Sequence, residues 1–239
     1  MRDSRIVTCP TGRLAKSEFA ATRLLDVGPA TIHLVCKGVP VCTELGTDPT
    51  QWSATSPLWP KGWFPKATQS FREAYRVGEA GDLERALAHL ADTRGPELRD
   101  WYDVHAQNSG NFRVAHFGRE PKPKSGLELD ALRDPKRFEG ELFERDGFRC
   151  RYCGTDVFST AMLKRFERMV GLHNFRATGT NATRHGVAMA FRAVLDHVEP
   201  YNRGGRTDPS NLVTSCWPCN YGKAEYTLPE LGLRDPRAV

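Results

Sequence analysis

The first half of the chain combines two kinds of apolar pattern. Short runs rich in β-branched residues and bounded by turn formers predict strands, whereas apolar residues three and four positions apart predict helices. Leu83, Leu87 and Leu90 have this helical spacing. The predicted strands lie at residues 4–9, 30–42 and 111–117, and the predicted helices at residues 67–78, 81–92 and 96–107. The first half is therefore expected to be an α+β domain, with a topology that the pattern leaves open.

A polar segment, FGREPKPKSGLELD at residues 117–130, separates the two halves of the chain. Its proline, lysine, glycine and serine content disfavours both a helix and a sheet ladder, which indicates a linker. We therefore divide the chain into an N-terminal domain, residues 1–118, a linker, residues 119–133, and a C-terminal domain, residues 134–239.

Helical periodicity returns directly after the linker. A helix is predicted over residues 134–147, because Asp134 can cap it and Pro135 suits its first turn. Leu142 and Phe143 contribute to its apolar stripe. Further predictions are a helix at 159–171, a strand at the end of 187–198, a short strand or turn at 211–216 and a helix at 217–226.

Composition limits the class of protein. Hydrophobic residues make up 39% and charged residues 26% of the 239 positions, as is ordinary for a soluble globular protein. No apolar run approaches the roughly 20 residues that cross a bilayer, and the first residues have no signal-peptide core, so we expect a cytoplasmic protein without a membrane partner. The net charge of +5 suits a polyanionic partner without establishing one.

Four of the seven cysteines form two Cys-x-x-Cys pairs, Cys150 with Cys153 and Cys216 with Cys219. In a reducing cytosol such pairs more often bind metal than form disulfides, and two of them together make the tetrahedral thiolate set of structural zinc. We therefore predict a zinc site. The other three cysteines match no zinc spacing, and whether they bind a second metal stays open: Cys9, Cys36 and Cys42.

Three segments around these pairs, FERDGFRCRYCG, LDHVEPYNRGGRTDPSNLVTSC and CNYGK, resemble the HNH endonuclease family in its four-cysteine, zinc-bound form. The resemblance covers residues 134–226 and does not reach the first half. It implies a ββα-metal, treble-clef-like nuclease domain. The stretch between Cys153 and Asp196 is longer than this family needs, so we read it as a helical insertion.

The resemblance also implies roles for individual residues. His197 would be the general base, Asp196 and Asn220 would hold a catalytic Mg²⁺ or Mn²⁺, and Asn211 would tie down the loop and help to fix the imidazole. Phosphodiester hydrolysis needs an activated water and charge stabilisation on the leaving oxygen, which agrees with such a set. The pKa of an imidazole lies near neutrality, which suits proton transfer.

Arg203 and Arg206 lie on a glycine-rich loop, and Lys223 lies one helical turn beyond Asn220. All three are candidate phosphate contacts, with solvated surface charge as the alternative. The tryptophan-rich stretch at residues 52–64 is a further candidate DNA surface, although its aromatic residues could equally pack against the N-terminal domain.

These residues together predict a metal-dependent DNA endonuclease, acting on double-stranded DNA in restriction or anti-phage defence. Two alternatives stay open: a nicking subunit of a larger phage-packaging, mobile-element or RNA-guided assembly, and a non-catalytic zinc module that binds nucleic acid. The N-terminal domain would select the target or dock a partner, either a second copy of the chain or a component of a defence complex. The sequence gives neither the target nor the oligomeric state.

Overall fold

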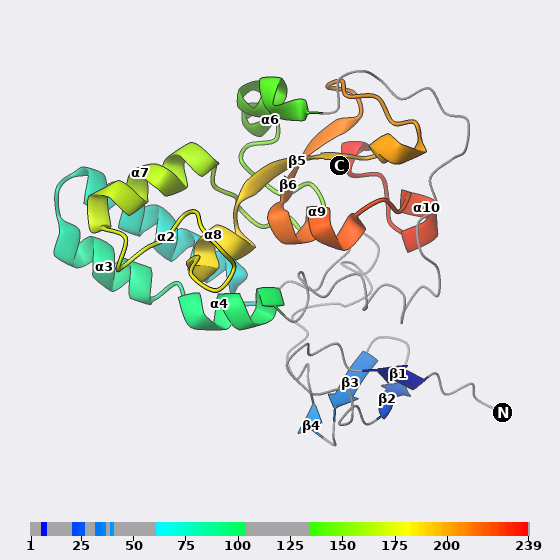
Figure 1. The fold of residues 1–239 in the computed structure, drawn as a ribbon, viewed down its shortest axis with the longest axis horizontal. Coiled ribbons are helices and arrows are strands. Elements are labelled where there is room, and N and C mark those ends of the chain that lie inside the picture. Colours follow the sequence, from blue (N-terminus) through cyan, green and yellow to red (C-terminus); the bar gives the residue numbers. More distant parts are fainter. Residues whose placement is uncertain are drawn as a thin grey trace.

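The computed structural model (Figure 1) describes residues 61–103 and 134–238, together with the backbone of four strands near the start of the chain. The strands pair antiparallel in the order β1-β2-β3-β4. Their bounds are β1 (Ile6–Thr8), β2 (Ala21–Asp26), β3 (Ile32–Cys36) and β4 (Val39–Pro40). The predicted run at 30–42 is thus two strands that pair with each other, and β2 was not predicted. The strand predicted at 111–117, the linker and residues 51–60 lie outside the described residues.

Three helices follow in the first half: α2 (Phe64–Glu79), α3 (Leu83–Ala91) and α4 (Gly95–Trp101). Helix α2 begins three residues earlier than predicted, because Pro65 occupies its first turn and Phe64 is buried. Asp82 caps α3 by accepting a hydrogen bond from the backbone N–H of Arg85. Leu83, which we expected on the apolar stripe, is 45% exposed, since Ala86 and Leu90 form the buried face instead.

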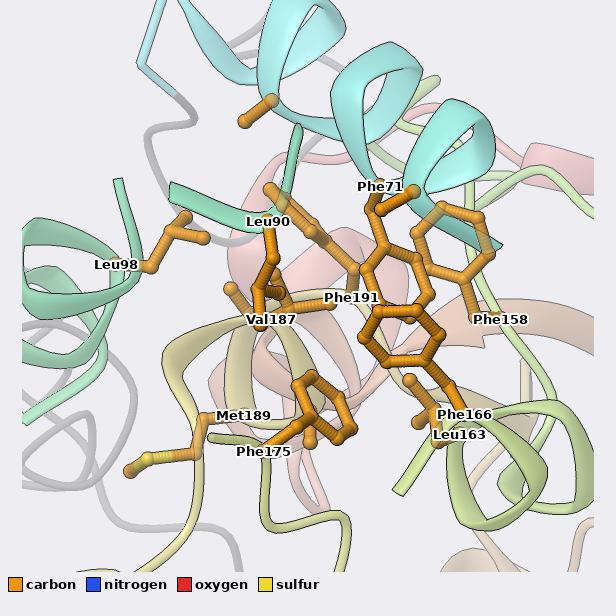
Figure 2. Close-up of a cluster of buried hydrophobic side chains, with 14 of the residues drawn as sticks. Phe71, Leu90, Leu98, Phe158, Leu163, Phe166, Phe175, Val187, Met189 and Phe191 are labelled. Atoms are coloured by element: carbon orange, nitrogen blue, oxygen red, sulfur yellow. The ribbon is translucent and has the colours of Figure 1, made fainter. Parts of the chain in front are cut away.

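The helical insertion packs against these three helices (Figure 1). It contains α7 (Thr160–Val170), capped by Ser159, and the short α8 (Gly186–Ala190). Figure 2 shows aromatic rings from both parts in one cluster. The Phe71 ring of α2 lies 4.7 Å from the ring of Phe158 and 5.0 Å from that of Phe166, between centroids. Residues 64–102 and 158–191 therefore share one hydrophobic core, and the division of the chain at residue 118 stays a prediction.

Helices α4 and α8 cross closely because glycines lie at the contact. A Cβ atom on Gly186 would lie 2.0 Å from the carbonyl oxygen of Gly95. A Cβ atom on Gly95 would lie 2.6 Å from Nε2 of His185, whose Nδ1 accepts a hydrogen bond from the backbone N–H of Val187 and so caps α8. The imidazole therefore has a structural role at the start of this helix.

The C-terminal half surrounds a two-stranded antiparallel sheet, β5 (Ala193–His197) and β6 (Leu212–Cys216). The helix predicted over 134–147 is a 3₁₀ turn followed by an α-helix, and Asp134 caps it as expected. The helical segments here are η2 (Pro135–Phe138), α6 (Glu139–Arg145), η3 (Tyr201–Arg203), α9 (Trp217–Lys223), α10 (Leu228–Leu231) and η4 (Pro236–Ala238). The described parts of the chain are thus mixed α and β, as the predicted α+β class requires, and none of their helices is long and apolar enough to cross a membrane.

The cap of α8 predicts a pH dependence of stability. Burial, together with the charge of Arg99, lowers the pKa of His185 from 6.5 to about 4. Between these values the unfolded chain binds a proton that the folded chain does not, so stability falls as the pH falls from 6.5 to 4, by at most about 3 kcal/mol. Asparagine can cap a helix without titrating. The variant His185→Asn should therefore lose this component of the pH dependence in denaturant unfolding.

The matched control is His173→Asn, because His173 is exposed. Its unfolding free energy should follow that of the unmodified chain at every pH. Identical pH profiles for the His185 and His173 variants would contradict a neutral, buried His185.

Candidate functional site

Strand β5, strand β6 and helix α9 position most of the predicted site residues. In the antiparallel register, Asp196 lies opposite Val213 and His197 opposite Leu212. Cys216 ends β6 and caps α9, where its Sγ accepts a hydrogen bond from the backbone N–H of Cys219. Strand and helix therefore meet at a cysteine, with Pro218 in the first turn of the helix.

The four paired cysteines come together although the two pairs are far apart in the sequence. Their Sγ atoms all lie within 4.8 Å of one another. Cys150 and Cys153 lie on a turn after α6, and the backbone N–H of Cys153 points to the Sγ of Cys150 at 3.5 Å. Four sulfur donors in this arrangement match the tetrahedral ligand set of structural zinc.

The electrostatics of the cluster also fit a cation. Burial raises the pKa values of the Cys216 and Cys219 thiols well above the usual value for a cysteine. Burial also opposes ionisation of Cys150, yet hydrogen bonds from the neighbouring thiols lower its pKa. Four clustered thiolates, three of them buried, are therefore unstable without a positive charge among them, which a coordinated Zn²⁺ would supply.

Asp196 lies on the buried side of β5, with 5% of its surface exposed. Its Oδ2 accepts a hydrogen bond of 2.6 Å from the hydroxyl of Tyr152 and forms an ion pair of 3.2 Å with Nζ of Lys223. Burial raises the pKa of Asp196, and the charge of Lys223 acts against this shift. The carboxylate thus lies beside α9, the helix that carries Asn220.

Lys223 is fully buried, and its ammonium group also donates a hydrogen bond of 2.7 Å to the carbonyl oxygen of His197. It therefore joins α9 to both of the adjacent residues Asp196 and His197. A phosphate contact would need an exposed ammonium group, and this position does not provide one. A buried ion pair with an additional hydrogen bond is expensive to break, because either partner alone would be an uncompensated buried charge.

His197 points away from Asp196, since adjacent residues of a strand face opposite sides. Its imidazole is half-buried, and its Nε2 lies 2.9 Å from Oγ1 of Thr207. The ring of Tyr201 lies 6.0 Å away, between centroids. Thr207 is 3% exposed and was not singled out from the sequence.

Asn211 holds the loop between β5 and β6 in place. Its Oδ1 accepts a hydrogen bond from the backbone N–H of Glu199, and its Nδ2 donates to the carbonyl oxygens of Glu199 and Arg206. A Cβ atom at Gly205 would lie 1.8 Å from the carbonyl oxygen of Glu199, so this closure requires glycine. The loop therefore folds back onto the end of β5, next to His197.

The remaining predicted residues differ in accessibility. Asn220 is half-buried on α9, one turn before Lys223. The side chain of Arg203 is only 13% exposed and forms an ion pair with Glu230. The side chain of Arg206 is 78% exposed and lies 3.9 Å from Asp208. Among the three candidate phosphate contacts, Arg206 is thus the most accessible.

A tryptophan that sequence reasoning did not single out joins α9 to the helical insertion. The indole of Trp217 packs against the guanidinium groups of Arg184 and Arg192, at 4.8 and 4.6 Å from the ring centroid. It also packs against the helical core, near Tyr102. Because Trp217 directly follows Cys216, the insertion and the cysteine cluster both fix the start of α9.

The strand–loop–strand–helix unit, with His197 at the end of its first strand, contains the segment that matches a known protein family. Residues 189–225 match the model of the HNH endonuclease family. This HNH segment, residues 189–225, includes β5, the loop, β6 and α9, and with them His197, Asn211 and Asn220. The match indicates nuclease action on nucleic acid. Neither the curated proteins nor the solved structures contain a match to the chain.

We expect the purified protein to contain close to one zinc ion and Cys216→Ser to lose it. Structural zinc sites contribute roughly 10–16 kcal/mol, which equals or exceeds the stability of a typical domain. The variant should therefore also lose ordered structure in residues 134–238. Metal analysis and hydrogen exchange measure the two effects. Cys42→Ser is the control and should keep the zinc; zinc retained by Cys216→Ser would contradict the site.

Proposed function

We propose that this protein is an endonuclease that depends on a divalent cation and hydrolyses phosphodiester bonds in double-stranded DNA. The observation that carries the proposal is the position of His197 within the HNH segment. Its imidazole lies at the end of β5, half-exposed and held by Thr207, while the adjacent Asp196 faces α9. A module that only binds nucleic acid has no use for a fixed imidazole beside a buried carboxylate.

His197 acts as the general base in this proposal. A neutral imidazole can accept a proton from water near pH 7, and partial exposure lets water and a phosphate approach it. The hydrogen bonds of Asn211 fix the loop that covers one side of the ring. The attacking water would therefore meet a base in one defined orientation, which lowers the entropic part of the barrier.

Asp196 and Asn220 would hold the catalytic cation, Mg²⁺ or Mn²⁺. A carboxylate and an amide oxygen are hard donors of the kind these ions prefer, and two protein ligands are typical where phosphate and water complete the shell. Oδ2 of Asp196 is engaged by Tyr152 and Lys223, whereas its Oδ1 makes no hydrogen bond within the described ranges and fits a ligand role. When bound, the cation stabilises negative charge on the leaving oxygen.

The cysteine cluster has a structural role in this proposal, in a treble-clef-like, zinc-bound form of the HNH domain. Arg206 is the proposed phosphate contact on the loop, because its guanidinium group is largely exposed. Three exposed basic residues on α7 are further candidates for contacts with the DNA backbone: Lys164, Arg165 and Arg168.

The N-terminal domain would select the target, and restriction or anti-phage defence is the biological role that we propose. An HNH site is directed at a phosphate, and phosphate contacts carry little sequence information. One site per chain cuts one strand, so a double-strand break would require two copies of the protein or two encounters.

The variant His197→Ala should lose cleavage of plasmid DNA in Mg²⁺ or Mn²⁺ by a factor of about 10²–10⁴, the usual contribution of a general base. Zinc content, secondary structure and DNA binding should be unchanged, because the imidazole is half-exposed and outside the cysteine cluster. His173→Ala is the matched control and should cleave normally. Normal cleavage by His197→Ala would exclude His197 as the base.

Asp196→Asn and Asn220→Ala should both raise the cation concentration needed for cleavage, yet differ in stability. Removing the Asp196 charge leaves the buried Lys223 ammonium uncompensated, which typically costs 3–5 kcal/mol, about the cost of breaking a buried pair. Asn220 takes no part in that pair, so Asn220→Ala should unfold at nearly the normal denaturant concentration. An unchanged cation requirement in both variants would contradict their role as ligands.

A further inference from the structure

We infer that Thr207 is the positioning residue for His197, and that Asn211 fixes the imidazole through Thr207. This inference rests on the proposed function of His197 as the general base. It assigns to Thr207 a role that the HNH match does not specify. It also gives a physical route by which the buried Asn211 acts on an imidazole 14 positions earlier in the chain.

The hydroxyl of Thr207 is built into the site. The residue is 3% exposed, and its Oγ1 lies 2.9 Å from Nε2 of His197. This distance is normal for a hydrogen bond. The bond replaces the hydrogen bond to water that the hydroxyl loses on burial. The contact is therefore well defined although Thr207 lies on a loop.

Asn211 fixes the chain on both sides of Thr207. Its Nδ2 donates to the carbonyl oxygen of Arg206 at 2.9 Å, and its backbone N–H donates to the carbonyl oxygen of Asp208 at 3.0 Å. The carboxylate of Asp208 in turn accepts hydrogen bonds from the backbone and hydroxyl groups of Ser210. With both neighbours anchored, the Thr207 side chain has little freedom to leave the imidazole.

The chemistry of the base requires one ring nitrogen to accept a proton while the other is held as a donor. In this inference Nε2 has the second role: its N–H donates to Oγ1 of Thr207, 2.9 Å away, and Nδ1 of the neutral ring accepts the proton. The same bond persists after Nδ1 accepts the proton from water, because Nε2 still carries its hydrogen. Thr207 therefore supports the ring before and after the transfer.

The first test determines the tautomer of His197 in protein without DNA and without the catalytic cation. In ¹⁵N-histidine-labelled protein, the signals of His197 are assigned by their absence in His197→Ala. We expect the unmodified chain and Thr207→Ser to have a protonated Nε2, and Thr207→Val to show a mixture of tautomers. Thr93→Val is the matched control, since Thr93 is also buried and its hydroxyl bonds a backbone carbonyl far from the site.

The second test measures cleavage of plasmid DNA by the same proteins, after zinc content and circular dichroism have confirmed their fold. Thr207→Val should lower kcat about tenfold, the effect of one hydrogen bond, with KM nearly unchanged. Thr207→Ser keeps the hydroxyl and should have the kcat of the unmodified chain. Thr93→Val should also cleave normally. If Thr207→Val fails to fold, Thr207→Ala, which also removes the hydroxyl but adds no bulk, replaces it in the comparison with Thr207→Ser and Thr93→Val, and the same loss of kcat is expected.

The outcomes separate this inference from the proposed function. Normal cleavage by His197→Ala overturns the function itself, whatever Thr207 does. Loss of cleavage in His197→Ala, with normal kcat and an unchanged tautomer in Thr207→Val, overturns the positioning role alone. A Nδ1-protonated ring in the unmodified chain also overturns it, because Thr207 would then donate to Nε2 and block the orientation that the base needs.

Discussion

The convergence of four cysteine sulfurs is the constraint on which the C-terminal half depends. Their separation of at most 4.8 Å fixes the turn after α6 against the junction of β6 and α9. Because Cys216 is at once the last residue of a strand and the cap of a helix, the cluster fixes the start of α9 directly after β6. The placement of Asn220 and Lys223 next to β5 depends on where this helix starts.

A second constraint comes from the helical insertion. Its core includes residues from the first half of the chain, so α2, α3 and α4 pack together with the insertion. The contact reaches the site through Trp217, which contacts two arginines and directly follows Cys216. The HNH segment is thus supported from two sides, by the cysteine cluster and by the helical core.

Much of the C-terminal half could be predicted from the sequence, because its signals are local. The cap at Asp134, the strand before His197 and the helix after Cys216 all follow from residue types at short spacing, and the cysteine pairs indicated their common ligand. Strand β2 could not be predicted, since its extended conformation depends on backbone pairing with β1 and β3, which are separate segments of the chain.

The roles of two residues in the site, Lys223 and Thr207, could not be predicted from a sequence pattern. Lysine is almost always exposed, so the burial of Lys223 depends on the carboxylate of Asp196 and the carbonyl oxygen of His197, which come from another segment of the chain. Thr207 resembles any hydroxyl residue in a polar loop, and its contact with His197 appears only when the loop folds back. In both cases a tertiary contact determines the role of the residue.

The burial of Lys223 also shapes the electric field of the site. An unpaired carboxylate at Asp196 would act as a negative monopole, whose repulsion of a phosphate decays slowly inside a low-dielectric protein. With an ammonium nitrogen 3.2 Å away, the two groups form a dipole of zero net charge, and its field weakens much faster with distance. A polyanion therefore meets less repulsion at the site than an unpaired carboxylate would cause.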